Sequence, residues 1–219
     1  ILGIAGVAGN GQRELAETLT GMRPTARGRV TVEGRRLRGG DARDAIRAGV
    51  AHVPEDRLRT GVAPSLSIAS NVALKSYRSR RLAFGPMLRL RMIREHAAAL
   101  IKRYDVRGGG PGLPARQLSG GNLQKVVLAR EFEGEPRVLV VASPTRGLDV
   151  AAIETVHRYL RDAAVGGVGV LLISEDLDEI LALSDRVAVM YEGALVGEVS
   201  ADVATVEEIG LLMAGGAAA

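Results

Sequence analysis

The sequence predicts an α/β fold in which a mostly parallel β-sheet is covered by helices, with a helical segment inserted between its strands. Three observations support this class. Residues 1–20 have the pattern of a buried strand, a glycine-rich turn and a helix. Residues 64–134 carry helix patterns, and from residue 138 onward apolar strands and helices alternate. Such alternation gives parallel strands joined by helical crossovers.

The first part of the chain is predicted to contain one helix and three strand-forming segments. Residues 1–7 form an apolar run typical of a buried strand, and residues 12–20 have apolar side chains at helical spacing. Residues 29–37 predict a short hairpin that turns at Gly34, and residues 49–53 predict another core strand.

The remaining elements are predicted from apolar periodicity and from continuous apolar runs. Helices are expected at residues 68–74, 92–104, 122–132, 151–164, 177–183 and 206–213, and strands at residues 138–142, 168–174 and 186–191. The predicted organisation is an α/β core of residues 1–63 and 135–219 with a helical subdomain of residues 64–134.

Composition limits the possible functions. The 219 residues are 47% apolar and include no cysteine and three histidines, so we expect a globular core without disulfides and without a metal cluster. No apolar run approaches the roughly 20 residues of a membrane-spanning helix. The net charge of +4 arises from 29 basic and 25 acidic residues that are interspersed, so no nucleic-acid partner is expected.

The densest basic region has two interpretations. Its six arginines are Arg78, Arg80, Arg81, Arg89, Arg91 and Arg94. They could lie near lipid headgroups, or they could belong to a solvated loop and helix start, which is the simpler interpretation.

Residues 6–14 have the glycine spacing of a phosphate-binding loop. In the working pattern G-x-x-x-x-G-K-[ST], backbone N–H groups surround the phosphates, the lysine neutralises them and the hydroxyl holds Mg²⁺. Here Gln12 stands at the lysine position and Arg13 at the hydroxyl position. Arg13 could reach a phosphate, or it could face solvent or a subdomain. The predicted nucleotide-binding positions are Gly6, Gly9, Asn10, Gly11, Gln12, Arg13 and Glu14.

A second motif lies at the start of a predicted helix. Residues 118–125 have the sequence LSGGNLQK, in which a hydroxyl and bare N–H groups can face a phosphate. Residues 144–149, with the sequence PTRGLD, follow the next predicted strand. On these strings the chain resembles the ABC ATPase family. The resemblance implies a P-loop NTPase-like core with a mostly parallel sheet and an inserted α-helical subdomain.

The resemblance also implies roles for particular residues. The signature residues that would act on the nucleotide of a partner domain are Ser119, Gly120, Gly121 and Asn122. Asp149 would be the aspartate of the D-loop, and Glu55 would stand at the Q-loop position. From the residues alone, Asp149 could equally be a helix N-cap, and residues 54–56 could be a simple turn.

The strings are most similar to the second, C-terminal nucleotide-binding domain of fused importers for simple sugars and nucleosides. Family members usually keep an Asp-Glu pair where this chain has Ala142 and Ser143, a departure closer to the nucleoside-type branch. Glu175 replaces the histidine that would contact the terminal phosphate. The residues that depart from a working site are Gln12, Arg13, Ala142, Ser143 and Glu175. We therefore expect a degenerate site that holds no metal and does not hydrolyse ATP. Separately, Asp176 and Glu179 could form a capping box for the helix that follows.

This resemblance implies ATP as the ligand, with Mg²⁺ only at the partner's site. The expected partners are a sister ABC ATPase domain on the same polypeptide, membrane permease subunits and, indirectly, an extracellular substrate-binding protein. The expected location is the cytoplasmic face of the cell membrane, and the strands that precede the phosphate loop in the family are expected to lie before residue 1. Two alternatives stay open: a soluble ABC-type ATPase of nucleic-acid metabolism, and a purely structural or regulatory module.

Overall fold

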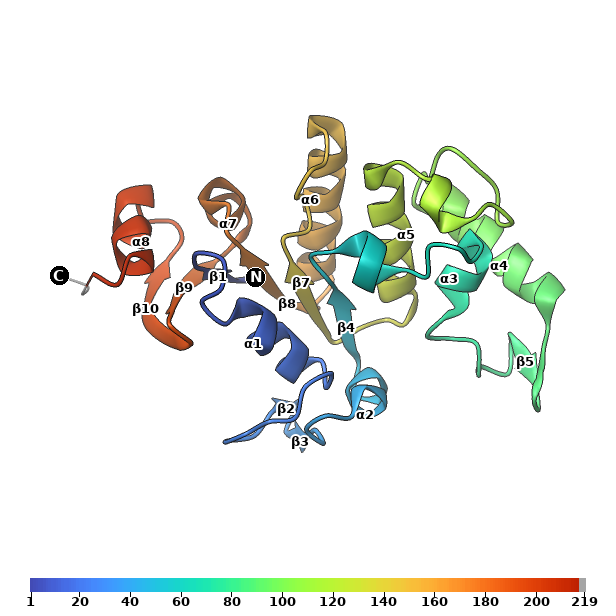
Figure 1. Ribbon diagram of the computed structural model, residues 1–219, viewed down its shortest axis with the longest axis horizontal. Coiled ribbons are helices and arrows are strands. Elements are labelled where there is room, and N and C mark those ends of the chain that lie inside the picture. The colour runs from blue at the N-terminus through green and yellow to red at the C-terminus, as the bar shows by residue number, and fades with distance from the viewer. Residues whose placement is uncertain (217–219) are drawn as a thin grey trace. The chain divides into compact units, whose positions relative to one another are not determined.

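The computed structural model describes residues 1–216 and contains a six-stranded sheet with the order β10-β9-β1-β8-β7-β4 (Figure 1). Strands β7, β8, β1 and β9 run parallel, and β10 pairs antiparallel with β9. The strands are β1 (Leu2–Ala5), β4 (Val50–Val53), β7 (Val138–Ala142), β8 (Gly169–Ser174), β9 (Arg186–Tyr191) and β10 (Ala194–Ser200). The predicted α/β fold with a mostly parallel sheet is confirmed.

The chain divides into two compact units. The core unit comprises Ile1–His52, Pro136–Pro144 and the residues from His157 on, and it contains the six-stranded sheet. The helical unit comprises Val53–Glu135 and Thr145–Val156.

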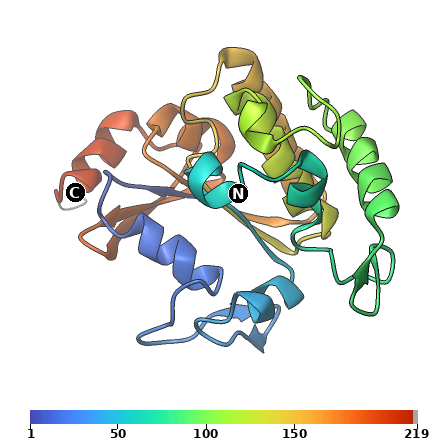
Figure 2. The ribbon, with the colours of Figure 1, turned by 45° about the vertical axis from the view of Figure 1, so that its right-hand side comes forward.

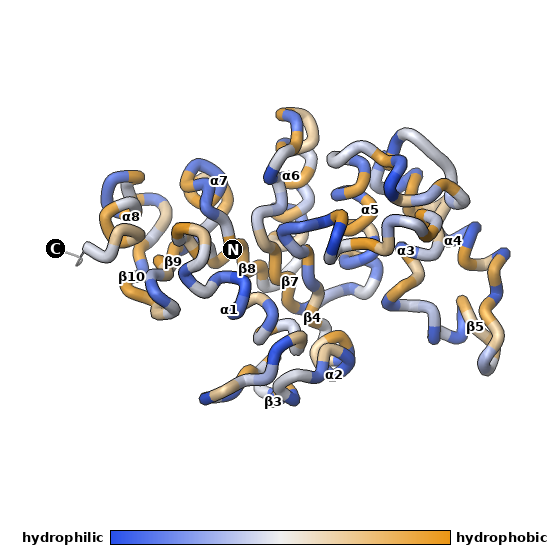
Figure 3. Tube along the Cα trace, in the orientation of Figure 1, coloured by the Kyte–Doolittle hydropathy of each residue, from blue (hydrophilic) through white to orange (hydrophobic). Residues whose placement is uncertain are grey.

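The two faces of the sheet in the core unit are covered by different helices. Ile4 points to one face, where it packs with Ala16 of α1 (Gln12–Leu19). Its neighbour Gly3 points to the other face, toward α7 (Leu177–Leu183). A Cβ added at Gly3 would lie 2.4 Å from Ser184 Oγ, so this strand position has no room for a side chain. Helices α1 and α7 lie on opposite sides of the sheet in Figure 1, and the apolar strands between them are visible in Figure 3. Helix α8 (Val206–Met213) packs against β9.

A short hairpin and a helix complete the core unit. Strands β2 (Thr31–Val32) and β3 (Arg35–Arg36) form the hairpin, followed by α2 (Ala42–Arg47). The buried Asp44 on α2 accepts a hydrogen bond of 2.9 Å from the backbone N–H of Arg38 and pairs with Arg35. The hydrogen bond from the backbone of Arg38 is the main cause that lowers the pKa of Asp44 below its usual value, and the charge of Arg35 adds to it.

Helices α3, α4 and α5 pack against one another in the helical unit (Figure 2). Their bounds are α3 (Ile68–Ala73), α4 (Leu90–Arg103) and α5 (Gly120–Glu133). The unit also contains a single π-helical turn, η1 (Arg57–Gly61), a hairpin of β5 (Ala83–Phe84) and β6 (Met87–Leu88), and a 3₁₀ turn, η2 (Ala115–Gln117). Helix α6 (Val150–Val165) begins within the residues of this unit. None of the helices in residues 1–216 is long and apolar enough to cross a bilayer.

Most predicted elements are confirmed, several with the expected bounds: β7, β9, α7 and α8. The strand predicted at residues 1–7 is shorter, because the chain leaves the sheet at Gly6 to form the glycine loop. Helix α2, strand β10, turn η1 and the β5–β6 hairpin were not predicted. These segments are either very short or, like β10, only partly buried, so their apolar pattern is weak.

A buried charge cluster fixes the π-helical turn to α5 in the helical unit. The carboxylate of Glu131 is 0% exposed, pairs with Lys75 and accepts a hydrogen bond of 2.9 Å from Arg130 Nε. Arg130 Nη1 in turn donates to the carbonyl of Gly61 at 2.7 Å, at the end of η1. The carboxylate is therefore compensated from two sides.

We predict that Glu131→Ala lowers the free energy of unfolding by about 3 kcal/mol, because it leaves the guanidinium of Arg130 buried without its carboxylate. Urea unfolding followed by circular dichroism measures the change. The control is Glu154→Ala on the exposed face of α6, which should leave the unfolding free energy within about 0.5 kcal/mol. Equal effects of the two substitutions would contradict the structural role of the cluster.

Candidate functional site

The carboxyl ends of three adjacent strands of the core unit bring predicted site residues to one edge of the sheet. Strand β1 lies beside β8, with Ala5 opposite Ser174, and β8 lies beside β7, with Ile173 opposite Ala142. The residues that follow these strands are Gly6, Glu175 and Ser143. The phosphate loop and the two departures therefore meet at this edge, as parallel pairing requires.

The phosphate loop, residues 6–14, ends at the start of α1. Gly11 is the N-cap of α1 with a φ of 106°, and no side chain caps the helix. A Cβ at Gly11 would lie 3.3 Å from Gly193 Cα, in the turn after β9. Asn10 fixes the loop to this turn, because its side-chain oxygen accepts a hydrogen bond of 2.9 Å from the N–H of Glu192. The loop thus has a backbone whose N–H groups at the start of α1 can bind an anion.

The side chain of Gln12 folds back onto the phosphate loop. Its Nε2 donates a hydrogen bond of 2.9 Å to the carbonyl of Val7. A Cβ at Gly6 would lie 2.5 Å from this Nε2, so the amide lies directly against the first glycine of the loop. A neutral amide therefore takes the place where a lysine would bring positive charge, and part of its donor capacity is used by the loop itself.

Arg13 is directed along the surface of α1. Its side chain is 78% exposed, and its Nε donates to Glu17 Oε1 at 2.8 Å, one helical turn away. Glu17 also pairs with Arg23, and hydrogen bonds from the two arginines, Arg13 first, lower the pKa of the Glu17 carboxyl. Of the alternatives that the sequence left open, the structure favours the solvent-facing one, with the charge of Arg13 balanced by Glu17.

The edge beside the phosphate loop offers few metal ligands. Ala142 has no oxygen in its side chain, and Ser143 is held at a φ of 40° with its N–H donating to the Ile173 carbonyl at 2.7 Å. Glu175 is exposed. Residues 1–216 contain no group of three or more histidine, aspartate or glutamate side chains that could hold a metal ion. The chemistry of these residues does not fit a resident Mg²⁺.

The capping box predicted at the start of α7 is only half correct. Asp176 caps the helix, since its side chain accepts from the N–H groups of Asp178 and Glu179. The Glu179 carboxylate does not return to Asp176. It is buried, accepts from Ser174 Oγ at 2.7 Å and lies 3.2 Å from His157 Nε2. The N–H of Asp176 donates instead to Ser174 Oγ at 3.1 Å, so the serine hydroxyl lies between the helix start and this carboxylate.

The signature residues form the N-terminus of α5 in the helical unit. Ser119 is the N-cap, and its hydroxyl accepts from Asn122 Nδ2 at 2.9 Å. The side-chain oxygen of Asn122 accepts from the N–H of Arg107 at 2.7 Å. A Cβ at Gly121 would lie 3.0 Å from Ala152 Cβ, near the start of α6. The side chains of Ser119 and Asn122 are held by these hydrogen bonds. The two glycines place no side chain over the backbone N–H groups at the start of α5.

Lys125, the last residue of the signature string, is used structurally. Its Nζ donates to the backbone carbonyl of Asp105 at 2.9 Å. Hydrogen bonding by Arg107, assisted by the charge of Lys125, lowers the pKa of Asp105. The lysine therefore braces the loop beside the signature helix.

Asp149 caps α6 within the helical unit. Its Oδ1 accepts a hydrogen bond of 2.9 Å from the N–H of Ala152. The N-cap role that the sequence allowed is confirmed, and the D-loop role stays a prediction.

Arg57 joins η1 to the 144–149 loop and to the signature turn. Its Nη1 donates to the carbonyl of Arg146 at 2.7 Å, and its Nη2 lies 3.5 Å from the carbonyl of Gly147. A Cβ at Gly120 would lie 2.8 Å from the same Nη2. One guanidinium thus contacts two separate segments, of which the carbonyl of Arg146 lies 89 residues further along the chain than Arg57. No role for Arg57 was predicted from the sequence.

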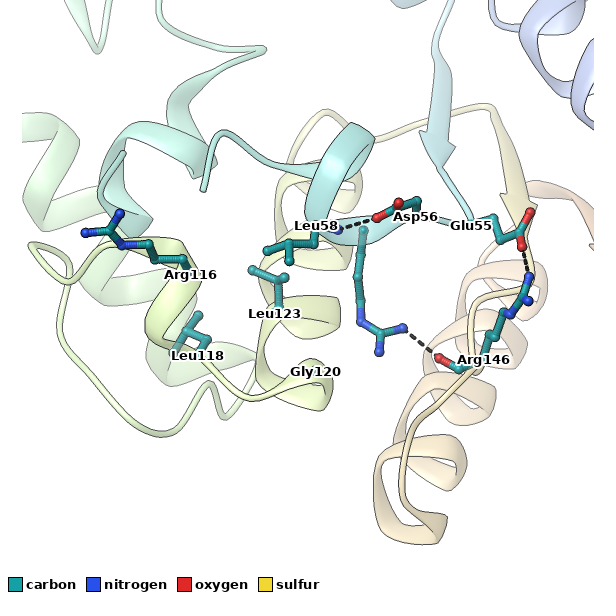
Figure 4. A pocket seen from close by; sticks show the side chains of 9 residues that line it. Glu55, Asp56, Leu58, Arg116, Leu118, Gly120, Leu123 and Arg146 are labelled. Atoms are coloured by element: carbon teal, nitrogen blue, oxygen red, sulfur yellow. Dashed lines mark hydrogen bonds and ion pairs between the residues drawn. The ribbon is translucent and has the colours of Figure 1, made fainter. Parts of the chain in front are cut away.

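Glu55 pairs with Arg146 at the border of a pocket of about 520 Å³ (Figure 4). The pocket lies within the helical unit and is lined by Glu55, Asp56, Arg57, Leu58, Arg116, Leu118, Gly120, Leu123 and Arg146. Asp56 begins η1 and accepts from the N–H groups of Leu58 and Arg59. The turn that the sequence allowed at residues 54–56 is therefore the N-cap of a π-helical turn, and the Q-loop role of Glu55 stays a prediction.

The fold and these two motifs define the class of protein. A glycine loop at the carboxyl edge of a parallel sheet, together with a serine-capped glycine pair on a separate helix, is typical of ATP-binding cassettes. The family model of the ABC transporter matches residues 1–146. The chain belongs to the ABC transporter family.

Similar proteins include importer components. A glucose import ATP-binding protein of Haloferax volcanii, TsgD13, is 49% identical over 99% of this chain and 40% of its own length. A nucleoside import ATP-binding protein of Lactococcus lactis, NupA, is 42% identical over 99% of this chain and 43% of its own length. The chain thus spans about two fifths of the length of these relatives.

A solved structure confirms the fold. The dimeric ATP-binding cassette MJ0796, in a post-hydrolysis state bound to ADP and Pi, aligns with a TM-score of 0.76 at 19% identity. The alignment covers 92% of this chain and 85% of that one. The ABC ATPase fold that the sequence predicted is therefore confirmed.

We predict that Arg57→Ala loosens the turns that Arg57 connects without unfolding the chain. Loss of a charge-assisted hydrogen bond to the carbonyl of Arg146 should increase amide exchange of residues 119–122 and 146–149 about tenfold. Hydrogen exchange read by mass spectrometry measures it. Arg59→Ala, two residues further along η1, is the matched control and should leave these segments unchanged. If amide exchange of these segments were the same in the wild-type chain and in both variants, the bridging role of Arg57 would be contradicted.

Proposed function

We propose that this chain is a nucleotide-binding domain of an ABC importer for a simple sugar or a nucleoside. In this proposal it supplies Ser119, Gly120, Gly121 and Asn122 to the nucleotide of a sister ATPase domain. Its own phosphate loop, residues 6–14, is degenerate and does not hydrolyse ATP. The substrate class rests on the names of the relatives, which import glucose and nucleosides.

One observation carries the proposal: both motifs have glycines at the start of a helix, but their side chains differ in chemistry. The signature turn has a serine cap, two glycines and no acidic side chain among its four residues. The phosphate loop has its glycine backbone, but a neutral Gln12 amide bonded to Val7 lies where positive charge is needed. A phosphoryl transfer site without lysine, metal support or a polarising carboxylate has little means to stabilise the transition state.

The charges around the phosphate loop support the same assignment. Arg13 is paired with Glu17, and Glu175 follows the strand next to the loop. An exposed carboxylate at this edge repels a terminal phosphate, whereas a histidine there would donate to it. We therefore propose that ATP can contact the backbone of the loop and that Mg²⁺ is held only at the partner's site.

The remaining partners follow from this role. A signature turn whose own loop is silent needs a second phosphate loop to act on, which we propose lies in a sister domain of the same polypeptide. We propose that the helical subdomain, residues 64–134, contacts the permease subunits at the cytoplasmic face of the membrane. An extracellular substrate-binding protein would act through those subunits.

We predict that substitutions in the signature turn reduce transport by the assembled importer, whereas substitutions at the edge of the phosphate loop have little effect on it. Ser119→Asp should preserve the cap, because aspartate is an equally good N-cap, yet place a negative charge toward the partner's phosphates. We expect transport to fall about 100-fold. Ser119→Thr keeps both the cap and the neutral charge and should retain most transport. Uptake of labelled substrate into proteoliposomes measures the rates.

The matched substitutions at the phosphate-loop edge are Arg13→Ala and Ser143→Ala. Each substitution should leave the transport rate within about twofold of the wild-type rate. A site that does not hydrolyse ATP has no transition state for these side chains to stabilise. If Ser143→Ala stopped transport while Ser119→Asp left it intact, the chain's own site would be the working one and the proposal would be wrong.

A further inference from the structure

The arginine hairpin, residues 76–94, belongs to the helical unit and is anchored there by buried apolar side chains. Leu82 is 1% exposed and packs with Ala73 and Ile93, on the two flanking helices. The N–H of Arg89 donates to the carbonyl of Leu82 at 2.8 Å and closes the base of the β5–β6 hairpin. The hairpin lies at the N-terminal end of α4 in both ribbon views (Figures 1 and 2). Its placement is therefore fixed while its tip is free of the core.

The tip of the arginine hairpin is apolar and exposed. Phe84 and Met87, opposite each other across the turn at residues 85–86, are 72% and 71% exposed. Leu88 and Leu90 continue this exposed apolar stretch toward α4, and Figure 3 shows it beside hydrophilic segments at β5. Large side chains displayed together on a protruding turn are not explained by the packing of the chain itself.

The flanks of the tip are basic. Residues 76–94 contain six arginines and no aspartate or glutamate. Only Arg91 among them forms an ion pair within residues 1–216, with Glu95 at 2.8 Å. Arg78 and Arg89 lie over the rings of Tyr77 and Phe84, at 5.4 Å and 5.9 Å from the ring centroids. The hairpin thus combines exposed apolar side chains with five arginines that form no ion pair within residues 1–216.

We propose that the arginine hairpin binds directly to the surface of an anionic membrane. Phe84 and Met87 enter the boundary between headgroups and acyl chains, and the flanking arginines contact lipid phosphates. Short apolar segments flanked by basic residues bind such interfaces because apolar burial and electrostatic attraction act together. This contact would orient the chain against the bilayer independently of any permease.

The composition of the tip favours lipid over other anionic partners. Single-stranded nucleic acid is bound by aromatic side chains that stack on bases, but the exposed tip has one aromatic side chain, Phe84, beside the aliphatic Met87, Leu88 and Leu90. A narrow turn also presents little surface for a protein partner of ordinary interface size. Aliphatic side chains that protrude between arginines gain most from the acyl region.

The experiment is co-sedimentation of the 219-residue chain with vesicles of phosphatidylcholine alone and of phosphatidylcholine mixed with phosphatidylglycerol. We expect binding only to the mixed vesicles, weakening as salt is raised. Phe84→Ser combined with Met87→Ser should lower the partition coefficient about tenfold, as should Arg80→Glu combined with Arg81→Glu. These side chains are exposed, so thermal unfolding should be unchanged.

The control carries the same change of charge elsewhere. Arg27→Glu combined with Arg29→Glu alters two exposed arginines of the core unit and should leave binding to mixed vesicles unaltered. Three results would overturn the proposal: no binding to mixed vesicles, an equal loss in the control, or tighter binding of the hairpin to single-stranded DNA than to the vesicles. Vesicle binding needs no sister domain or permease, so none of these results bears on the importer function.

Discussion

The parallel pairing of β7, β8 and β1 is the constraint on which the core unit depends. It brings the ends of three strands to one edge, where the phosphate loop, Ser143 and Glu175 follow. Parallel strands need crossovers that cover both faces of the sheet, and α1 and α7 provide this cover. Gly3 and Gly6 allow the close approaches that result, since a Cβ at either position would lie within 2.5 Å of a neighbouring side chain. The backbone of the core unit at this edge therefore depends on these two glycines.

The backbone of the phosphate loop and the side chains around it contribute differently to nucleotide binding and to hydrolysis. A phosphate-binding backbone needs only glycines with positive φ and a helix start, which Gly9 and Gly11 retain. Hydrolysis needs charge placed around the phosphates, and we propose that Gln12, Ala142 and Glu175 do not supply it. In the helical unit, Arg57 contacts both the signature turn and the 144–149 loop, so these two segments are held together. The proposed division of labour between the two motifs rests on this contrast.

The sequence predicted the fold and its long elements because they carry strong periodic or continuous apolar patterns. Strand β7 and helix α7 have the bounds that their patterns indicate. Contacts between segments distant in sequence could not be predicted, since no local pattern encodes them. The bond from Arg57 to the Arg146 carbonyl belongs to this group. The bonds from Gln12 to Val7 and from Ser174 to Glu179 each span only five residues, but they depend on the backbone turn between a strand and a helix, which apolar periodicity does not encode.

We propose above all that the phosphate loop keeps a phosphate-binding backbone but lacks the side chains that hydrolysis needs. Titration calorimetry of the chain with ATP, with Mg²⁺ and with a chelator, tests it most directly when phosphate release is measured on the same samples. The account predicts weak binding that is nearly equal in the two conditions, since only backbone N–H groups contribute, and no phosphate release above a protein-free sample. Tight binding that requires Mg²⁺, with phosphate release that Gly11→Val abolishes, would contradict it.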